Sequence, residues 1–183
     1  MTDLPKRKPN RLKDYDYGQN GAYFVTICTK NHECLFGTVG ATVPGRPPVS
    51  SNIPYRSFVS LTELGKFVDK SIIYTHNNGD LNVKIEKYVI MPNHVHLIIG
   101  LYSETGDRPR SPLQMVVRNI KSYVSKWAGF TVWQKSFYDH IIRDDEDYNR
   151  VAEYIENNPE KWIEDRYYLR QANELIQHHR KYR

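Results

Sequence analysis

Two histidines separated by one residue, His94 and His96, lie in an otherwise apolar segment, MPNHVHLII, which runs from Met91 to Ile99. Alternate side chains of a β-strand point to the same face, so both imidazoles are expected on one face of a sheet. Imidazoles about 6–7 Å apart on one face can bind a single metal ion. They can equally be polar side chains on a solvated face, and the rest of the sequence has to decide between the two.

A tyrosine and an asparagine lie four residues apart in a later segment, RVAEYIENNPEKW. We predict a helix from about Asp145 to Asn158, ended by Pro159, so Tyr154 and Asn158 should share one face of its last turn. A tyrosine taken alone is more often a packed amphipathic residue than a nucleophile. Beside two histidines, however, an amide oxygen could complete a site for Mg²⁺ or Mn²⁺, with phosphate and water in the remaining positions. Such an ion polarises a phosphodiester and helps to remove the proton of a nearby phenol.

The elements that must position these side chains are predicted from hydrophobic periodicity and turn residues. A buried strand is expected at Gly21–Lys30, followed by a helix that Ser60 caps, with Glu63 in the capping-box position. The later elements are two strands that meet at Met91-Pro92-Asn93, a helix that has Pro112 in its first turn and stops at Gly129, a strand within residues 133–144 and the helix that carries Tyr154. This order, β-α-β-β-α-β-α, predicts an α+β fold in which helices pack on an antiparallel sheet.

The chain of 183 residues is long enough for one domain with its own core. We expect a basic N-terminal arm at 1–20, the folded domain at 21–162 and a basic tail at 163–183, with a proline-rich surface loop at 38–57. The two cysteines lack the spacing of a disulfide framework, which predicts a reduced, cytoplasmic protein. The sequence has neither a membrane-length apolar run nor the apolar core of a secretory signal, so we expect no membrane partner.

The formal net charge is +5, and the excess lies mainly near the two ends of the chain and around one predicted helix. Uneven basic charge is typical of proteins that bind a phosphate backbone, although a solvated charge run gives the same pattern. Candidate DNA contacts in the arm combine cations with rings that can stack on unpaired bases: Lys8, Arg11, Lys13, Tyr15 and Tyr17. The alternative is that the tyrosines only pack the arm against the domain. Arg118, Lys121 and Lys126 are close to one helix face and could hold a duplex stem.

Three segments resemble one known group of proteins. MPNHVH resembles the two-histidine signature of HUH endonucleases, and WQKSFYDHIIRDDEDYNRVAEYIENNPEKW resembles the tyrosine-bearing segment of their single-tyrosine transposase branch. The opening RLKDYDYGQNGAYFVTICT is similar to the N-terminal pattern of REP-associated tyrosine transposases, which recognise short palindromic repeats in bacterial genomes. The resemblance covers roughly residues 11 to 162 and implies the ferredoxin-like palm of the HUH proteins. Residues 38–57 depart from it, because the family usually has a short hairpin there.

The resemblance implies a role for each residue of the pattern. His94, His96 and Asn158 would bind a divalent metal, Mg²⁺ or Mn²⁺, and Tyr154 would be the nucleophile. The implied reaction is attack on single-stranded DNA at a hairpin with a short guide sequence, which leaves a 5′-phosphotyrosine link and a free 3′-hydroxyl. A monomer is expected, with a dimer as the alternative. Tyr148, the other tyrosine of this helix, is a weaker candidate for the nucleophile because it lies on the apolar stripe.

Two other classes of function remain open at this point. A DNA-hairpin-binding protein could keep the fold with weak or absent catalysis. An RNA-binding α+β module could use the histidines and tyrosines to stack on bases. A metal-dependent covalent adduct with DNA is what separates the enzyme from both.

Overall fold

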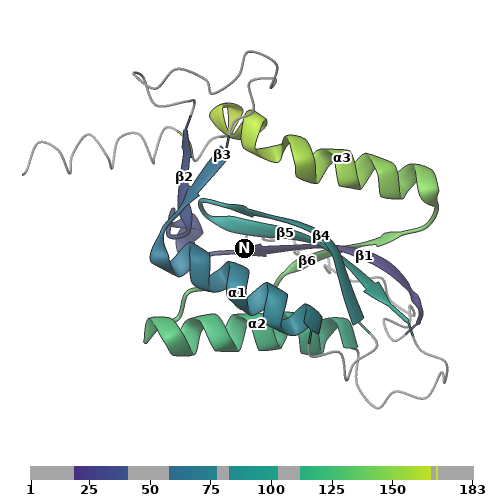
Figure 1. Ribbon diagram of the computed structural model, residues 1–183, viewed down its shortest axis with the longest axis horizontal. Helices are drawn as coiled ribbons and strands as arrows, with labels where there is room; N and C mark the ends of the chain where they lie inside the picture. Colours follow the sequence, from purple (N-terminus) through teal and green to yellow (C-terminus); the bar gives the residue numbers. More distant parts are fainter. Residues whose placement is uncertain (1–18, 41–57, 78–82, 103–111, 166–167, 169–183) are drawn as a thin grey trace, which may run out of the picture.

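The computed structural model describes residues 19–40, 58–77, 83–102, 112–165 and 168 (Figure 1). The predicted DNA contacts of the arm lie outside the described residues, as does nearly all of the predicted C-terminal tail; these contacts are Lys8, Arg11, Lys13, Tyr15 and Tyr17. Within the described ranges, every helix falls short of the apolar length that a bilayer crossing requires.

A four-stranded antiparallel sheet forms the centre of the domain. Its strands are β1 (Gly21–Cys28), β4 (Val83–Met91), β5 (His94–Leu101) and β6 (Tyr138–Ile142), in the spatial order β4-β5-β1-β6. β5 is central and almost wholly buried, because both faces of the sheet are covered. This α+β architecture confirms the predicted fold class, and the order of the strands is that of the ferredoxin-like split β-α-β arrangement.

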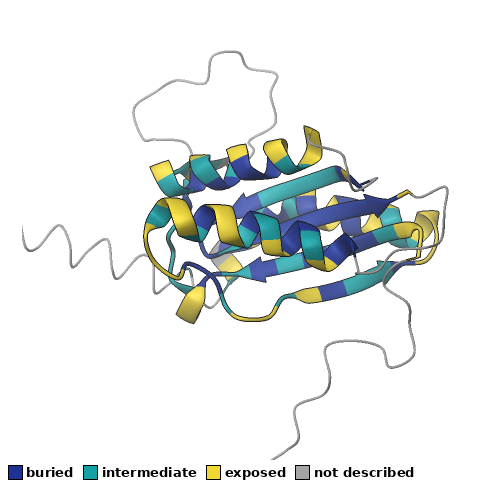
Figure 2. Ribbon diagram, turned by 90° about the horizontal axis from the view of Figure 1, so that it is seen from below, coloured by how far each residue is buried: buried dark blue, intermediate teal, exposed yellow. Residues whose placement is uncertain are grey.

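Three helices cover the sheet, two on one face and one on the other (Figure 1). α1 (Glu63–Asn77) and α2 (Pro112–Ala128) share one face, and α3 (Asp145–Lys161) lies on the opposite face. Gly129, with φ of 76°, follows α2 as predicted, since glycine adopts the left-handed conformation without steric cost. Figure 2 shows buried residues along the strands and along the inward sides of the helices.

The alternation of side chains along the strands divides the core into two clusters. The larger cluster joins the sheet to α1 and α2 and includes Val25, Leu97, Val68, Ile72 and Ile120. The smaller cluster joins the other face of the sheet to α3 and consists of the buried residues Ile98, Ile142, Val151, Ala152 and Ile155. Residues next to each other in β5, such as Leu97 and Ile98, therefore belong to different clusters, as a period of two requires.

The start of α1 differs from the sequence prediction, which is wrong about its cap. Ser60 lies in a short strand, β3 (Phe58–Leu61), which pairs with β2 (Gly37–Gly40) to form a second sheet. Thr62 caps the helix instead, because its Oγ1 accepts a hydrogen bond from the backbone N–H of Gly65 at 3.1 Å. The predicted loop at 38–57 is corrected at its first residues, since Thr38–Gly40 belong to β2, and residues 41–57 lie outside the described part.

The ends of three other elements also differ from their predictions. Pro159 does not end α3, which continues to Lys161 and is followed by a 3₁₀ turn, η2 (Trp162–Glu164). Proline lacks only its own N–H, while its carbonyl still accepts a hydrogen bond from the backbone N–H of Trp162. β1 stops at Cys28, and β6 is limited to Tyr138–Ile142, with Trp133 joined to Thr29 by an isolated bridge.

Candidate active site

The β4–β5 hairpin places both histidines of the MPNHVH segment beneath α3. The two-residue turn Pro92-Asn93 ends directly at His94, the first residue of β5. His94 and His96 occupy the same face of the strand, and their ring centroids are 4.5 Å apart. The prediction that the two imidazoles share a face is therefore confirmed.

His96 is held from the neighbouring strand. Thr26 of β1 lies directly across from it in the antiparallel register, and Thr26 Oγ1 is 2.8 Å from His96 Nδ1. The Phe24 ring stacks on the imidazole with a centroid separation of 5.2 Å. His96 is only 4% exposed, so its ring has little freedom to turn.

His94 is held by its own turn and by the end of α3. Its Nδ1 is 2.6 Å from Oδ1 of Asn93, a side chain that is 1% exposed. The Asn158 side chain lies close enough to the His94 ring to raise the pKa of that imidazole. The indole of Trp162 approaches from the other side, with ring centroids 6.1 Å apart.

Burial keeps both imidazoles in the neutral form. Desolvation lowers the pKa of His94 to about 4, against smaller opposing effects of the Asp165 charge and the Asn158 hydrogen bond. Desolvation also lowers the pKa of His96 well below its usual value, and the neighbouring His94 lowers it further. Neutral imidazole is the form that binds metal ions, so neither ring has to lose a proton first at neutral pH.

Tyr154 lies over the histidines from α3. Its hydroxyl is 3.5 Å from His96 Nε2, at the outer limit of a hydrogen bond, and its ring meets the Phe24 ring edge-on at 5.9 Å. Tyr154 is 42% exposed, whereas Asn158, one turn later, is 8% exposed. The fold thus brings together His94, His96, Tyr154 and Asn158, which the sequence spreads over 65 positions.

His94, His96 and Asn158 could together hold a divalent metal ion. Within the part of the chain that the structure describes, no group of three His, Cys, Asp or Glu side chains could hold a metal. Two imidazoles and one amide oxygen would leave several positions for water and phosphate, as ions that prefer octahedral coordination require. The Nδ1 atoms of both histidines already have partners, so each ring can offer its Nε2.

The predicted contacts on α2 lie away from this cluster. Arg118 and Lys126 are exposed, but α2 covers the opposite face of the sheet from α3 (Figure 1). Lys121 is not a free surface cation: its Nζ donates to the backbone carbonyls of Gln134 and Lys135 at 2.6 and 3.1 Å. Burial also lowers the pKa of Lys121. Lys121 therefore binds the segment between α2 and β6, and its role as a DNA contact stays a prediction.

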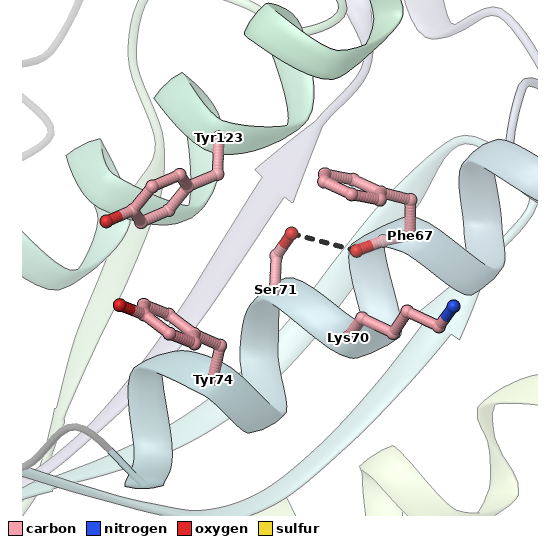
Figure 3. Close-up of a pocket in the computed structure, with 5 residues that line it drawn as sticks. All are labelled: Phe67, Lys70, Ser71, Tyr74 and Tyr123. Atoms are coloured by element: carbon pink, nitrogen blue, oxygen red, sulfur yellow. Dashed lines mark hydrogen bonds between the residues drawn. The ribbon is translucent and has the colours of Figure 1, made fainter.

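A groove between α1 and α2 contains none of the predicted site residues. Phe67, Lys70, Ser71, Tyr74 and Tyr123 line this space of about 310 Å³ (Figure 3). The hydroxyl of Ser71 donates to the backbone carbonyl of Phe67 at 2.8 Å, so it does not offer a proton to the groove. The groove is separated from the histidines by the whole sheet.

Sequence reasoning missed three residues that support the histidines: Thr26, Asn93 and Trp162. Asn93 could have been noticed, because it precedes His94 in a turn and asparagine side chains often bond to nearby groups. The role of Thr26 depends on the pairing of β1 with β5, and that of Trp162 on the continuation of α3 past Pro159. Neither has a local sequence signal.

Comparison with known proteins places the chain among bacterial relatives. No protein-family model matches it. An uncharacterized protein of Haemophilus influenzae is 34% identical over 187 residues, which cover 89% of this chain and 93% of that protein. The REP-associated tyrosine transposase of Escherichia coli K12 is 33% identical over 87 residues, which cover 46% of this chain and 50% of the relative. The chain therefore matches only about half the length of that transposase.

A solved structure of a REP-associated tyrosine transposase bound to a REP hairpin has a similar fold. It matches with a TM-score of 0.51 and 22% identity, over 88% of this chain and 74% of that one. This likeness shows that the two proteins share a fold, an α+β arrangement with helices on an antiparallel sheet. The chain belongs to one family with the H. influenzae protein, and it is a relative of the REP-associated tyrosine transposases.

Proposed function

We propose that the protein is a metal-dependent endonuclease and strand transferase for single-stranded DNA. The observation that carries this proposal is the Tyr154 hydroxyl 3.5 Å from His96 Nε2, in a cluster that also holds His94 and Asn158. A phenol, two neutral imidazoles and an amide within one small site are the groups that tyrosine attack on a phosphodiester needs. Relationship to the REP-associated tyrosine transposases supports the same reaction.

In the proposed reaction the Tyr154 oxygen attacks a phosphorus atom of the DNA backbone. The bond between phosphorus and the 3′-oxygen breaks, so the fragment with the 5′-phosphate becomes linked to Tyr154, and the other fragment of the same strand ends in a 3′-hydroxyl. The proton of the phenol leaves to solvent, which reaches the half-exposed side chain, and the departing 3′-oxygen takes a proton from water. A 3′-hydroxyl can reverse the step without external energy, since one phosphodiester bond replaces another.

The chain's own residues supply the binding site for the metal and the orientation of the nucleophile. His94, His96 and Asn158 would hold Mg²⁺ or Mn²⁺, which when bound polarises the phosphodiester and offsets the charge that develops on it. Phe24 contacts the rings of both His96 and Tyr154, and so fixes the phenol relative to the imidazole. A phenol is a weak acid, and a cation held beside Tyr154 would help it to lose its proton.

We propose that each chain completes its own site and acts as a monomer. Only Arg143 and Asp144 connect β6 to α3. Asp144 Oδ1 accepts a hydrogen bond from the backbone N–H of Asp147, whose carboxylate lies 2.8 Å from His140 Nε2 in β6. Because the linker is only two residues long and is hydrogen-bonded at both ends, α3 could not pack on the sheet of a second chain unless β6 also left its own sheet.

The proposed substrate is a DNA hairpin of a palindromic repeat with a short single-stranded guide sequence, and the proposed compartment is the cytoplasm. The solved relative that shares the fold is bound to a REP hairpin, which supports a hairpin partner here. Arg118 and Lys126 would attract the duplex stem to the α2 side by charge. The arm residues Lys8, Arg11, Lys13, Tyr15 and Tyr17 stay as predicted contacts for the guide sequence.

A denaturing-gel assay tests the proposal. The full chain is incubated with labelled hairpin oligonucleotides from repeats that flank its gene, with Mn²⁺, Mg²⁺ or EDTA. We expect a covalent adduct that requires the metal and disappears in Tyr154→Phe and in His94→Ala. Because each variant keeps the other half of the site, a mixture of the two tests the monomer at the same time.

The outcomes separate the candidates. Adduct in the mixture would show that α3 serves a partner chain, contrary to the proposed monomer. Tight hairpin binding with no adduct under any metal would replace the enzyme with a hairpin-binding protein. Metal-independent binding with preference for RNA would favour the RNA-binding module.

A further inference from the structure

The two histidines differ from ordinary surface imidazoles in that each Nδ1 already has a built-in partner. Asn93 Oδ1 is 2.6 Å from His94 Nδ1, and Thr26 Oγ1 is 2.8 Å from His96 Nδ1. A histidine that binds a metal through one ring nitrogen needs its other N–H held by an acceptor, which fixes both the tautomer and the ring orientation. The question is whether these two partners can act as acceptors.

The contacts of the Asn93 side chain decide the tautomer of His94. Asn93 Nδ2 donates to the backbone carbonyl of His32 at 3.4 Å, and a carbonyl can only accept. The amide oxygen must therefore face His94, and an oxygen facing a neutral ring at 2.6 Å requires the proton on Nδ1. This leaves a lone pair on His94 Nε2.

The backbone of the turn prevents Asn93 from changing its position. The Asn93 carbonyl accepts a hydrogen bond from the backbone N–H of Thr29 at 2.9 Å, and it shares the Thr29 hydroxyl, at 3.0 Å, with the Glu33 carbonyl at 2.8 Å. Thr29 itself is fully buried. Asn93 is thus held at its backbone carbonyl by Thr29, the residue after β1, and at its side chain by the His32 carbonyl.

Thr26 can serve His96 in the same way. A hydroxyl both donates and accepts, so Thr26 Oγ1 can accept the Nδ1 proton whenever His96 Nε2 is used for binding. The β1–β5 register sets the two side chains opposite each other, and Nε2 then points to Tyr154.

We infer that Asn93 and Thr26 are positioning residues of the metal site, which hold His94 and His96 with the proton on Nδ1 and Nε2 free to bind Mg²⁺ or Mn²⁺. The inference rests on the proposed function, because it concerns the same site. It adds a specific requirement. A hydrogen-bond acceptor must be present at positions 93 and 26, and a side chain of the same shape without an acceptor should not replace it.

Two matched pairs of variants test this requirement with Mn²⁺ alone as the probe. Thr26→Val keeps the shape and removes the hydroxyl, while Thr26→Ser restores it. Asn93→Leu removes the amide, while Asn93→Asp keeps an acceptor for Nδ1–H. Electron paramagnetic resonance of free Mn²⁺ gives the Kd of each folded full-length protein. We expect Kd to rise about 10–100-fold in Thr26→Val and Asn93→Leu, and to stay near the wild-type value in the Ser and Asp controls.

Nuclear magnetic resonance of the metal-free protein labelled with ¹⁵N-histidine reads the tautomer directly. We expect wild-type His94 to carry its proton on Nδ1 and to lose this preference in Asn93→Leu. If Asn93→Leu does not fold, the inference is still tested by the Mn²⁺ affinities of the two Thr26 variants and by the tautomer of His94 in the wild-type protein. Unchanged Mn²⁺ affinity in both apolar variants, or a wild-type His94 protonated on Nε2, would overturn the inference alone. A wild-type protein that neither binds Mn²⁺ nor forms an adduct would refute the proposed function and the inference with it.

Discussion

Two helices on opposite faces of the central sheet, α3 and α2, carry opposite net charge. α3, which covers the histidines, has six acidic and two basic residues, whereas α2 on the other face has three basic residues and no acidic one. Exposed large apolar side chains also gather on the second face, where Tyr74, Tyr123 and Trp127 are each about half exposed. The two faces therefore present different surfaces to an anionic polymer.

The difference suggests how binding and chemistry are divided. A phosphate that approaches α3 meets net negative charge, so a bound cation between the histidines and the phosphate would offset a repulsion that the helix itself creates. The basic α2 face could attract DNA at longer range, where charge matters more than contact. Nonspecific DNA would then be held away from Tyr154 until the metal and the correct backbone position are both in place.

The two faces also differ in packing, and a matched pair of core substitutions should show it. Ile120 belongs to the larger cluster and Ile155 to the smaller one, and they are 1% and 2% exposed. We expect Ile120→Ala to lower the free energy of unfolding by about 4 kcal/mol and Ile155→Ala by about 2 kcal/mol, because α3 can relax into the space that is left. Urea denaturation measures both values.

Amide hydrogen exchange sharpens this prediction. Ile155→Ala should speed exchange in α3 much more than in α2, since a helix held by a small cluster can open locally. Ile120→Ala should speed exchange throughout the domain. Equal acceleration of both helices in Ile155→Ala would mean that the two layers unfold as one unit.

A smaller effect is expected at the start of α3, where Asp147 joins Arg150 and His140. The hydrogen bond from Arg150, with a smaller contribution from His140, lowers the pKa of Asp147 to about 2. A carboxyl whose pKa is lower in the folded state stabilises the fold above its ordinary pKa of 3.8, and this stabilisation is lost as the pH falls toward 2. Arg150 is 74% exposed, so solvent screens this ion pair and its contribution to the free energy of unfolding should be small.

Asp147→Asn should therefore lower the urea midpoint at pH 6 and have almost no effect near pH 2. Glu153→Gln, an exposed change of the same kind on the same helix, serves as the control for net charge. If both variants show the same pH dependence, the effect comes from the overall acidity of α3 and not from this cluster.

The smallest effect is expected in the groove of the opposite face. Tyr123→Ala truncates a side chain that is 46% exposed and belongs to α2, on the opposite face of the sheet from α3. We expect the initial rate of adduct formation to stay unchanged, with Tyr154→Phe as the inactive reference. A large fall in rate, with stability unchanged, would show that the groove contacts the DNA during the reaction. It would contradict the separation of binding and chemistry between the two faces.

Several features of the fold were predictable because they depend on local pattern. The β4–β5 hairpin, the amphipathic α2 and its glycine stop were all expected from periodicity and turn residues, and the structure has them. The errors occurred where two local signals competed. Ser60 and Thr62 are both acceptable caps, and only the pairing of β3 with β2 excludes Ser60. A proline usually ends a helix, but α3 continues past Pro159, and Trp162 then lies beside the His94 ring.

By itself, the sequence determined the chemistry that is available and part of its arrangement. The strand period of two places His94 and His96 on one face, and the helix period places Tyr154 and Asn158 on one face, because these spacings follow from backbone geometry alone. Only the tertiary structure brought the two pairs together, since Tyr154 and His96 are 58 residues apart and Thr26 and His96 are 70 apart. It also separated Lys121 from the surface cations, because whether a lysine faces solvent or backbone carbonyls depends on the loop that folds beside it.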